Sequence, residues 1–168
     1  PPTGVSILMF EPLAVRSGDE PDTIYGLLAE GIKVAPDKSS VTFRINPKAR
    51  FYNGDPVTAA DVKYSFEMLT SKGAAPAVRA ALDKVKFGAI LDERTIRFDL
   101  EERTDDNVFN IAGIPVFSPK WGLGADGKPK PLDQIVTEYP ITTGPYTIER
   151  TDSGRGIEFR RNPDYWAR

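Results

Sequence analysis

Apolar and polar residues alternate along short stretches of the chain, the pattern of strands that bury one face. The clearest stretches are VTFRI at 41–45 and TIRFDL at 95–100. A third, VKFGAIL at 85–91, is separated from TIRFDL only by the charged residues 92–94, so these two stretches predict a hairpin. We therefore expect the middle of the chain to form an antiparallel sheet with one solvated face.

A period of three to four residues replaces this alternation after residue 58 and predicts an amphipathic helix. The residues on its buried face are Val62, Ser65, Phe66 and Leu69. Gly73 predicts the end of the helix, because glycine readily adopts the left-handed conformation that often follows a last helical turn. Shorter helices are predicted at 76–82, which begins with a proline, and at 105–113.

The start of the long helix is the most specific local signal in the chain. Thr58 and Asp61 have the spacing of a capping box, and Pro56 leads into it. Asn53 and Gly54 just upstream predict a tight turn, since glycine can adopt the positive φ that such a turn requires. We interpret all five residues as structural.

The last third of the chain carries weaker signals. Residues 122–131 are rich in glycine, proline and lysine and predict an exposed loop. A short helix is predicted at 131–138. The stretches 145–150 and 156–161 alternate again and predict a second hairpin across 151–155. Helices packed over a mostly antiparallel sheet make the expected fold class α+β.

Composition changes this picture mainly by exclusion. The 168 residues contain no cysteine and no histidine, which excludes disulfides, Cys/His zinc sites, cysteine nucleophiles and histidine bases within the chain. We expect no metal site and no cofactor. The formal charge is -2 and the 22 basic residues are scattered, so no nucleic-acid-binding surface is indicated. No apolar run approaches the roughly 18–20 residues of a membrane span.

Pairs of adjacent acidic residues raise one alternative function. The pairs are Asp19-Glu20, Asp92-Glu93, Glu101-Glu102 and Asp105-Asp106. A glycosidase needs two carboxylates flanking a sugar bond, but most of these pairs fall at predicted turns or strand ends, where solvated carboxylates are expected. We expect no enzyme; the alternative is a carbohydrate-acting enzyme or a surface adhesion module that uses the acidic loops.

Aromatic residues divide into two groups. Those on apolar faces of the predicted elements are most simply core residues: Phe43, Phe66, Phe98 and Phe159. Those near loops or element ends are Trp121, Tyr139, Tyr146, Tyr165 and Trp166. The second group covers the edge of a core in our interpretation, because Trp and Tyr favour half-solvated positions with a polar tip. Stacking on a ligand is the alternative.

Three stretches, taken in order, resemble one family. FYNGDPVTAADVKYSFEML at 51–69 is similar to the F-x-D/N-G-x-P-(V/L)-T-A-x-D-V-x-x-S signature of the family 5 extracytoplasmic solute-binding proteins of ABC importers. MFEPLAV at 9–15 and YGLLAE at 25–30 match segments that precede the signature. TTGPYTIER at 142–150 and FRRNPDYW at 159–166 resemble its later T-G-P-Y and R-N-P-x-Y-W stretches. Similarity is greatest to the branch that carries oligopeptides and microcin C-like cargo.

The resemblance implies part of one lobe of a two-lobed periplasmic-binding-protein type II fold. Residues 1–119 are then the small subdomain of the first lobe, and residues 120–168 return, incompletely, to the ligand-binding lobe. PPTGVSILMFEP at the start has no basic region and too short an apolar run for a signal peptide. Either a mature protein begins there or the chain is an internal fragment; the resemblance favours a fragment without its second lobe.

Ligand-binding positions are also implied by the resemblance. They correspond to the segment after the signature helix and to the strand before the boundary, which point to Arg79 and to Ile114, Val116 and Phe117. The first segment departs from the family pattern, because residues 75–78 read APAV where relatives often place an aromatic residue.

Mechanism in this family is capture without chemistry. The implied solute is an oligopeptide or a related small molecule, the implied partner is the ABC permease, and the implied location is periplasmic, either free or lipid-anchored. The glycine of T-G-P-Y, Gly144, is expected to serve backbone geometry and not to contact ligand.

Overall fold

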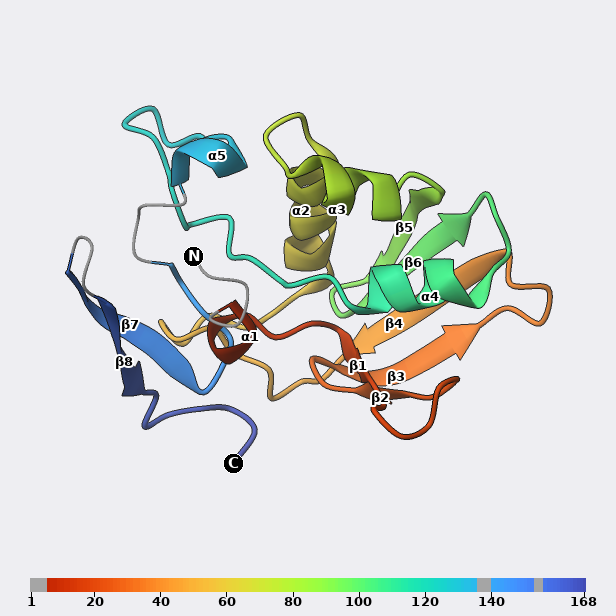
Figure 1. Ribbon diagram of the computed structural model, residues 1–168, viewed down its shortest axis with the longest axis horizontal. Helices are drawn as coiled ribbons and strands as arrows, with labels where there is room; N and C mark the ends of the chain where they lie inside the picture. Colours follow the sequence, from red (N-terminus) through yellow and green to blue (C-terminus); the bar gives the residue numbers. More distant parts are fainter. Residues whose placement is uncertain (1–5, 136–139, 153–155) are drawn as a thin grey trace.

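Our computed structural model describes residues 6–135, 140–152 and 156–168. A four-stranded antiparallel sheet lies at its centre, with the strand order β3-β4-β6-β5 (Figure 1). Its strands are β3 at Ala29–Val34, β4 at Ser40–Ile45, β5 at Val85–Asp92 and β6 at Thr95–Leu100. The α+β fold class with antiparallel strands is therefore confirmed.

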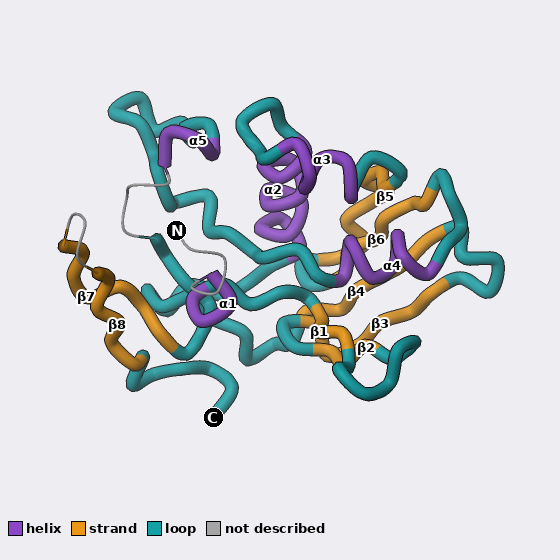
Figure 2. Tube along the Cα trace, in the orientation of Figure 1, coloured by secondary structure: helices purple, strands orange, loops and turns teal. Residues whose placement is uncertain are grey.

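The other elements pack on this sheet or extend away from it to one side (Figure 2). The helices are α1 at Ser6–Met9, α2 at Ala59–Thr70, α3 at Pro76–Ala81, α4 at Asp105–Ala112 and α5 at Leu132–Ile135. Two-stranded antiparallel sheets are formed by β1 at Ala14–Arg16 with β2 at Ile24–Gly26, and by β7 at Tyr146–Asp152 with β8 at Gly156–Arg161.

Alternation in β4 and β6 fixes the buried face of the central sheet. Val41 lies opposite Phe98, and Phe43 lies opposite Ile96. All four side chains are completely buried, as their period-two spacing predicts. The predicted hairpin of β5 and β6 is confirmed; its edge strand β5 is mostly exposed and carries two register shifts.

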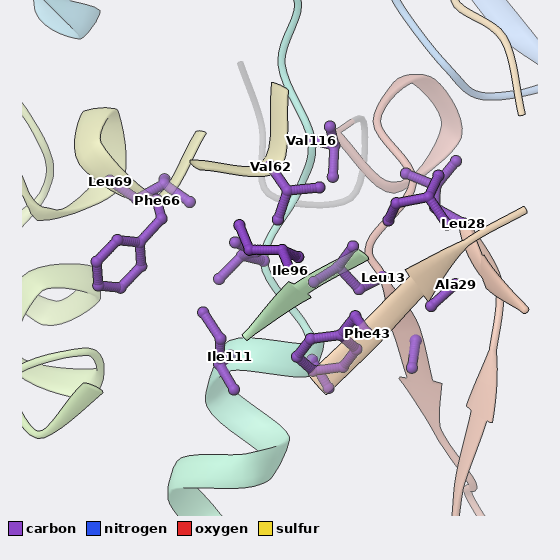
Figure 3. Close-up of a cluster of buried hydrophobic side chains, with 14 of the residues drawn as sticks. Leu13, Leu28, Ala29, Phe43, Val62, Phe66, Leu69, Ile96, Ile111 and Val116 are labelled. Carbon is purple, nitrogen blue, oxygen red and sulfur yellow. The ribbon is translucent and has the colours of Figure 1, made fainter. Parts of the chain in front are cut away.

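Helix α2 packs on this sheet and completes the main core. Figure 3 shows Val62, Phe66 and Leu69 of α2 with the strand residue Ile96 in one apolar cluster. The Phe66 and Phe98 rings lie 5.1 Å apart between centroids. The predicted helical face is therefore confirmed. Burial of its apolar surface stabilises the fold by about 25 cal/mol for each Å² removed from water.

The end of α2 differs from the prediction. The helix ends at Thr70, and the extended residue Ser71 caps it through its hydroxyl, which donates to the Met68 carbonyl at 2.7 Å. Gly73 lies beyond the cap and has no positive φ. The prediction that Gly73 stops the helix was wrong, because a local side-chain bond satisfied the last turn earlier.

Several elements were not predicted. Strands β1 and β2 have three residues each, too few for a period to be visible, and β3 contains Gly31 beside a register shift. The predicted helices at 76–82 and 105–113 are confirmed as α3 and α4, and the hairpin at 145–161 as β7 and β8. Of the predicted helix at 131–138, α5 is present; residues 136–139 lie outside the described residues, as does the hairpin tip at 153–155.

Helices of the described residues are all shorter and less apolar than a membrane span requires.

Candidate functional site

Three of the four predicted ligand-binding residues lie in the connection that follows α4. Ile114, Val116 and Phe117 are 3%, 0% and 7% exposed, and all belong to the core cluster. Phe117 packs edge-on against Phe10 at 5.1 Å and against Trp121 at 5.6 Å between ring centroids. Their side chains are therefore part of the core and are not exposed to solvent.

Main-chain contacts place this connection between two other segments. The Val116 N–H donates to the Glu11 carbonyl at 3.2 Å, and the Phe117 N–H donates to the Ser65 hydroxyl of α2 at 2.7 Å. The connection is thus held on one side by the MFEPL segment and on the other by the signature helix. Sequence reasoning assigned Ser65 to the buried face of α2 and did not predict this bond.

The fourth predicted residue, Arg79, lies apart on α3. Its side chain is half-buried, and its Nε atom is buried without a hydrogen-bond partner among the described residues. No hydrogen bond or ion pair of that part of the chain joins it to residues 114–117. The Arg79 Nε–H is thus a donor that no described residue accepts. Leaving a buried donor unpaired costs free energy.

The cap and turn residues of the signature have the structural roles predicted for them. The Asp61 carboxylate accepts from the Thr58 N–H and from the Thr58 hydroxyl, both at 2.8 Å, which forms the capping box at the start of α2. Desolvation raises the pKa of Asp61, and its bonds to Thr58 lower it in part. Gly54 has a φ of 87°, and Pro56 pairs with Arg50 in an isolated bridge.

The turn of the signature does more than lead into the helix. The Tyr52 N–H donates to the Thr142 carbonyl at 2.7 Å, and the Tyr52 hydroxyl accepts from Arg160 at 2.7 Å. Lys120 donates to the Asp55 carboxylate at 2.7 Å, and together with Asn53 it lowers the pKa of Asp55. The turn therefore contacts the C-terminal segment, by which we mean the described residues 140–152 and 156–168, as well as Lys120.

Glu11 forms a second junction with the C-terminal segment. It is 3% exposed, and its carboxylate accepts hydrogen bonds from the Tyr165 hydroxyl and from the Trp166 indole N–H, the latter at 2.7 Å. Its main-chain N–H donates to the Thr143 hydroxyl at 2.9 Å. Burial raises the pKa of Glu11, and the two side-chain bonds lower it in part. Burial and the nearby carboxylate raise the pKa of Tyr165.

Gly144 lies where two backbones come close together. Its N–H donates to the Met9 carbonyl at 2.8 Å, and a Cβ atom at this position would lie 2.5 Å from the Leu8 carbonyl oxygen. Its φ is not positive. Gly144 is needed for close approach and not for a left-handed turn. Figure 1 shows α1 beside β7 at this junction.

Carboxylates of the predicted acidic pairs do not converge on a reaction site. Asp105 pairs with Lys38 at 2.6 Å, Glu101 pairs with Lys86 at 3.7 Å, and both pairs are exposed. The described residues contain no group of acidic side chains that could hold a metal ion. A shallow cavity of about 260 Å³ lies at the start of α2 and is lined by residues that include Arg50, Glu93 and Arg94.

Comparison with known proteins identifies the family. Residues 23–168 match the model of the bacterial extracellular solute-binding proteins, family 5, middle part. The chain belongs to this family. Its members are binding proteins, so the family-level prediction is confirmed.

Relatives are about one third identical to this chain over the part that aligns with it. A putative binding protein of Brucella melitensis, BMEII0691, is 35% identical over 162 residues, 96% of this chain and 26% of the relative. The probable peptide-binding protein YejA of Agrobacterium fabrum is 33% identical over 99% of this chain and 27% of its own length. The peptidoglycan-binding protein YepA of the same organism is 33% identical over 96% and 26%. The chain spans about a quarter of the length of these relatives.

Solved structures of family 5 proteins share the fold. A dipeptide-binding protein from Pseudoalteromonas sp. SM9913, in complex with Met-Leu, superimposes with a TM-score of 0.82 at 21% identity, over 100% of this chain and 37% of that one. The oligopeptide-binding protein AppA of Bacillus subtilis, in complex with a nonapeptide, gives 0.75 at 20% identity, over 97% and 32%. These likenesses confirm the predicted lobe fold.

Proposed function

We propose that this chain is part of the first lobe of a solute-binding protein that captures peptides outside the cytoplasm and delivers them to an ABC permease. The observation that carries the proposal is the family match over residues 23–168. The name of the YejA relative supports a peptide as the solute. Family 5 proteins are extracellular by description, and a periplasmic location of the whole protein is part of the proposal.

Capture in this proposal needs a second lobe from the rest of the whole protein. The chain spans about a quarter of its relatives, and we propose that the connection with the buried residues Val116 and Phe117 forms part of one wall of the binding site. Residues 1–119 would form the small subdomain and residues 120–168 the return to the ligand-binding lobe. The open protein would take up the solute, and hinge closure would enclose it before docking on the permease.

Ligand contacts from this wall would come from two places. Arg79 is the polar candidate: its side chain is half-buried, and its guanidinium group would donate to a peptide carbonyl or carboxylate. The side chains of Ile114, Val116 and Phe117 are already packed in the core. The solute would therefore contact the outer surface of this connection. Binding would proceed without chemistry and without a cofactor.

The names of two relatives both point to a ligand that contains peptide. One is named for peptides and another for peptidoglycan, whose cross-linking stems are short peptides. We therefore propose that the solute carries a short peptide and that the groups recognised are its backbone and its charged termini. Such groups need hydrogen-bond partners once they are buried.

Calorimetric titration of the full-length protein with a pool of synthetic tripeptides to pentapeptides tests the proposal. A dissociation constant in the micromolar range or below is expected. A parallel titration with peptidoglycan fragments distinguishes the two sources of peptide. The enzyme alternative would be established instead by two results together. Neither titration would produce binding heat, and the protein would hydrolyse a glycan in a reaction that Glu101→Gln or Asp105→Asn abolishes.

A further inference from the structure

Glu11 connects three parts of the chain that are far apart in sequence. Its carboxylate binds Tyr165 and Trp166, which lie 154 and 155 residues away. Its N–H binds Thr143, 132 residues away. Its carbonyl accepts from Val116, which belongs to the predicted ligand-facing connection. One buried residue thus contacts that connection and the C-terminal segment at the same time.

Each oxygen of the carboxylate has one side-chain partner. Tyr165 donates to Oε1, and Trp166 donates to Oε2. Both partners are donors in this arrangement, and an ionised carboxylate accepts on both oxygens without presenting a hydrogen. A glutamine has one acceptor oxygen and would turn its NH2 group toward the other partner, so only a carboxylate accepts from both donors at once.

Stability alone is a poor reason for this carboxylate. No lysine or arginine in the described ranges forms an ion pair with Glu11, and burial raises the pKa of its carboxyl group. Burial of an unpaired charge costs several kcal/mol unless hydrogen bonds offset it. Directional bonds to two specific donors instead fix one orientation, whereas apolar contacts of similar area would permit several.

The signature turn makes a second set of contacts with the C-terminal segment, in addition to those of Glu11. Tyr52 binds the Thr142 carbonyl and the Arg160 side chain, so neighbouring residues 142 and 143 are held by separate segments. Gly144 allows the closest approach at the same place. The C-terminal segment is consequently held at its start and near its end.

We propose that Glu11 is a positioning residue: by holding Thr143, Tyr165 and Trp166 while its carbonyl binds Val116, it sets the orientation of the C-terminal segment relative to the ligand-facing connection. This inference rests on the proposed function, since the geometry it protects is that of the peptide-binding wall. Glu11 itself is not required to touch the solute.

The test compares three variants of the full-length protein. Glu11→Gln removes one of the two acceptors, Trp166→Phe removes the indole donor but keeps an aromatic ring, and Glu20→Gln is the matched control. Glu20 accepts from the Tyr25 hydroxyl at 2.8 Å in an exposed position, so the control makes the same Glu-to-Gln change at a tyrosine-bound carboxylate that is not buried. Trp166→Phe decides the outcome if Glu11→Gln does not fold.

Two readouts separate orientation from function. Hydrogen–deuterium exchange reports the amides of Thr143, Gly144 and Val116, whose donors are held near Glu11. We expect Glu11→Gln to speed exchange at these amides about tenfold and to weaken peptide affinity about tenfold, the scale of one lost charged hydrogen bond. Trp166→Phe should change both in the same direction by a smaller factor, and Glu20→Gln should change neither.

Each contrary result has a distinct meaning. Unchanged exchange in Glu11→Gln and Trp166→Phe would show that Glu11 holds nothing in place and would overturn the inference. Faster exchange with unchanged peptide affinity would overturn the positioning role while the proposed function stands. A wild-type protein that binds no peptide from the pool would overturn the proposed function and the positioning role together, even if the exchange data showed that Glu11 holds the segment.

Discussion

The central sheet and the junction around Glu11 are held together by different forces. In the sheet, Phe43, Phe98 and their neighbours are apolar, fully buried and contributed by adjacent strands. At the junction, Glu11, Thr143 and Tyr52 make directional hydrogen bonds to residues about 90 to 155 positions away. The sheet gains stability from burial, and the junction gains a defined orientation. The difference suggests that substitutions should separate the two: large losses of stability in the sheet, and smaller, more local losses at the junction.

The largest effect is expected for Phe98→Ala. The ring packs between Phe43 and Phe66, and its removal leaves a cavity in the main core. The free energy of unfolding should fall by about 3–5 kcal/mol, the usual cost of a buried Phe-to-Ala change. Urea denaturation followed by circular dichroism measures it.

Phe87→Ala is the matched control for this prediction. Phe87 lies directly opposite Phe98 on the edge strand β5, but 37% of it is exposed. Its removal should cost far less than the loss of Phe98. Equal losses in the two variants would contradict the assignment of the main core to the inner face of the sheet.

Gly144→Ala should produce the next largest effect, at the junction. The added methyl group would lie 2.5 Å from the Leu8 carbonyl oxygen, so one of the two backbones must move. Overpacking of this kind costs about 1–3 kcal/mol. Gly18→Ala is the control, because nothing lies within 4 Å of a Cβ atom there. A Gly144→Ala variant as stable as Gly18→Ala in urea denaturation would mean that the close approach of residues 8 and 144 is not required.

Local patterns predicted the strands β4, β5 and β6 of the sheet and could not predict the junction. The period-two spacing of Val41 and Phe43 contains all that is needed to assign a buried face, and Thr58 with Asp61 contains a complete cap. Partners of Glu11 lie more than 100 residues away, and no spacing rule spans that distance. Glu11 lies in MFEPL and Tyr165 and Trp166 in R-N-P-x-Y-W, so the two motifs were seen without their connection.

The predicted ligand residues illustrate the same limit. A family resemblance located Ile114, Val116 and Phe117, but the depth of their burial depends on packing against Phe10 and Trp121. Apolar residues between two turns can face a core or a cleft, and the sequence alone does not distinguish these cases. Their part in binding stays a prediction for the full-length protein.

Thr58→Ala tests a local feature that joins the two regions. Loss of the hydroxyl removes one of the two bonds to the Asp61 carboxylate at the start of α2. The expected cost is about 1 kcal/mol, as for other helix caps. Thr58→Ser keeps the hydroxyl and should restore most of this stability in the same urea experiment. A serine variant as unstable as the alanine variant would assign the effect to packing of the threonine methyl group instead.

The pH dependence of stability tests the electrostatics of Glu11. Burial raises the pKa of Glu11 above its ordinary value of 4.5, so the folded state binds this proton more tightly than the unfolded state. Linkage then requires the Glu11 contribution to stability to be greatest below pH 4.5 and to decline as the pH rises through the folded pKa.

Comparison with Glu11→Gln isolates this contribution, because the glutamine side chain does not titrate. The stability of the wild type relative to this variant should decrease as the pH is raised from 4 to 7, measured by urea midpoints at each pH. Groups with lowered pKa values, such as Asp55 and Asp92, lose their contributions only when the pH falls through values below 3.8 and cancel in the comparison. A relative stability that increases over this range would contradict the buried, proton-binding state of Glu11.

The smallest effect is expected for exposed ion pairs, which occur in both regions. Lys38 and Asp105 lie 2.6 Å apart beside the sheet, and Lys120 and Asp55 lie 2.7 Å apart beside the junction. Double-mutant cycles with Lys38→Met and Asp105→Asn, and with Lys120→Met and Asp55→Asn, should give small coupling energies, close to the error of the measurement and reduced further by salt. Similar small values in both places are required if burial holds the sheet and buried directional bonds hold the junction. A coupling several times larger at Lys120 and Asp55 would instead assign the orientation of the C-terminal segment to surface charge, and the contrast between the two regions would have to be redrawn.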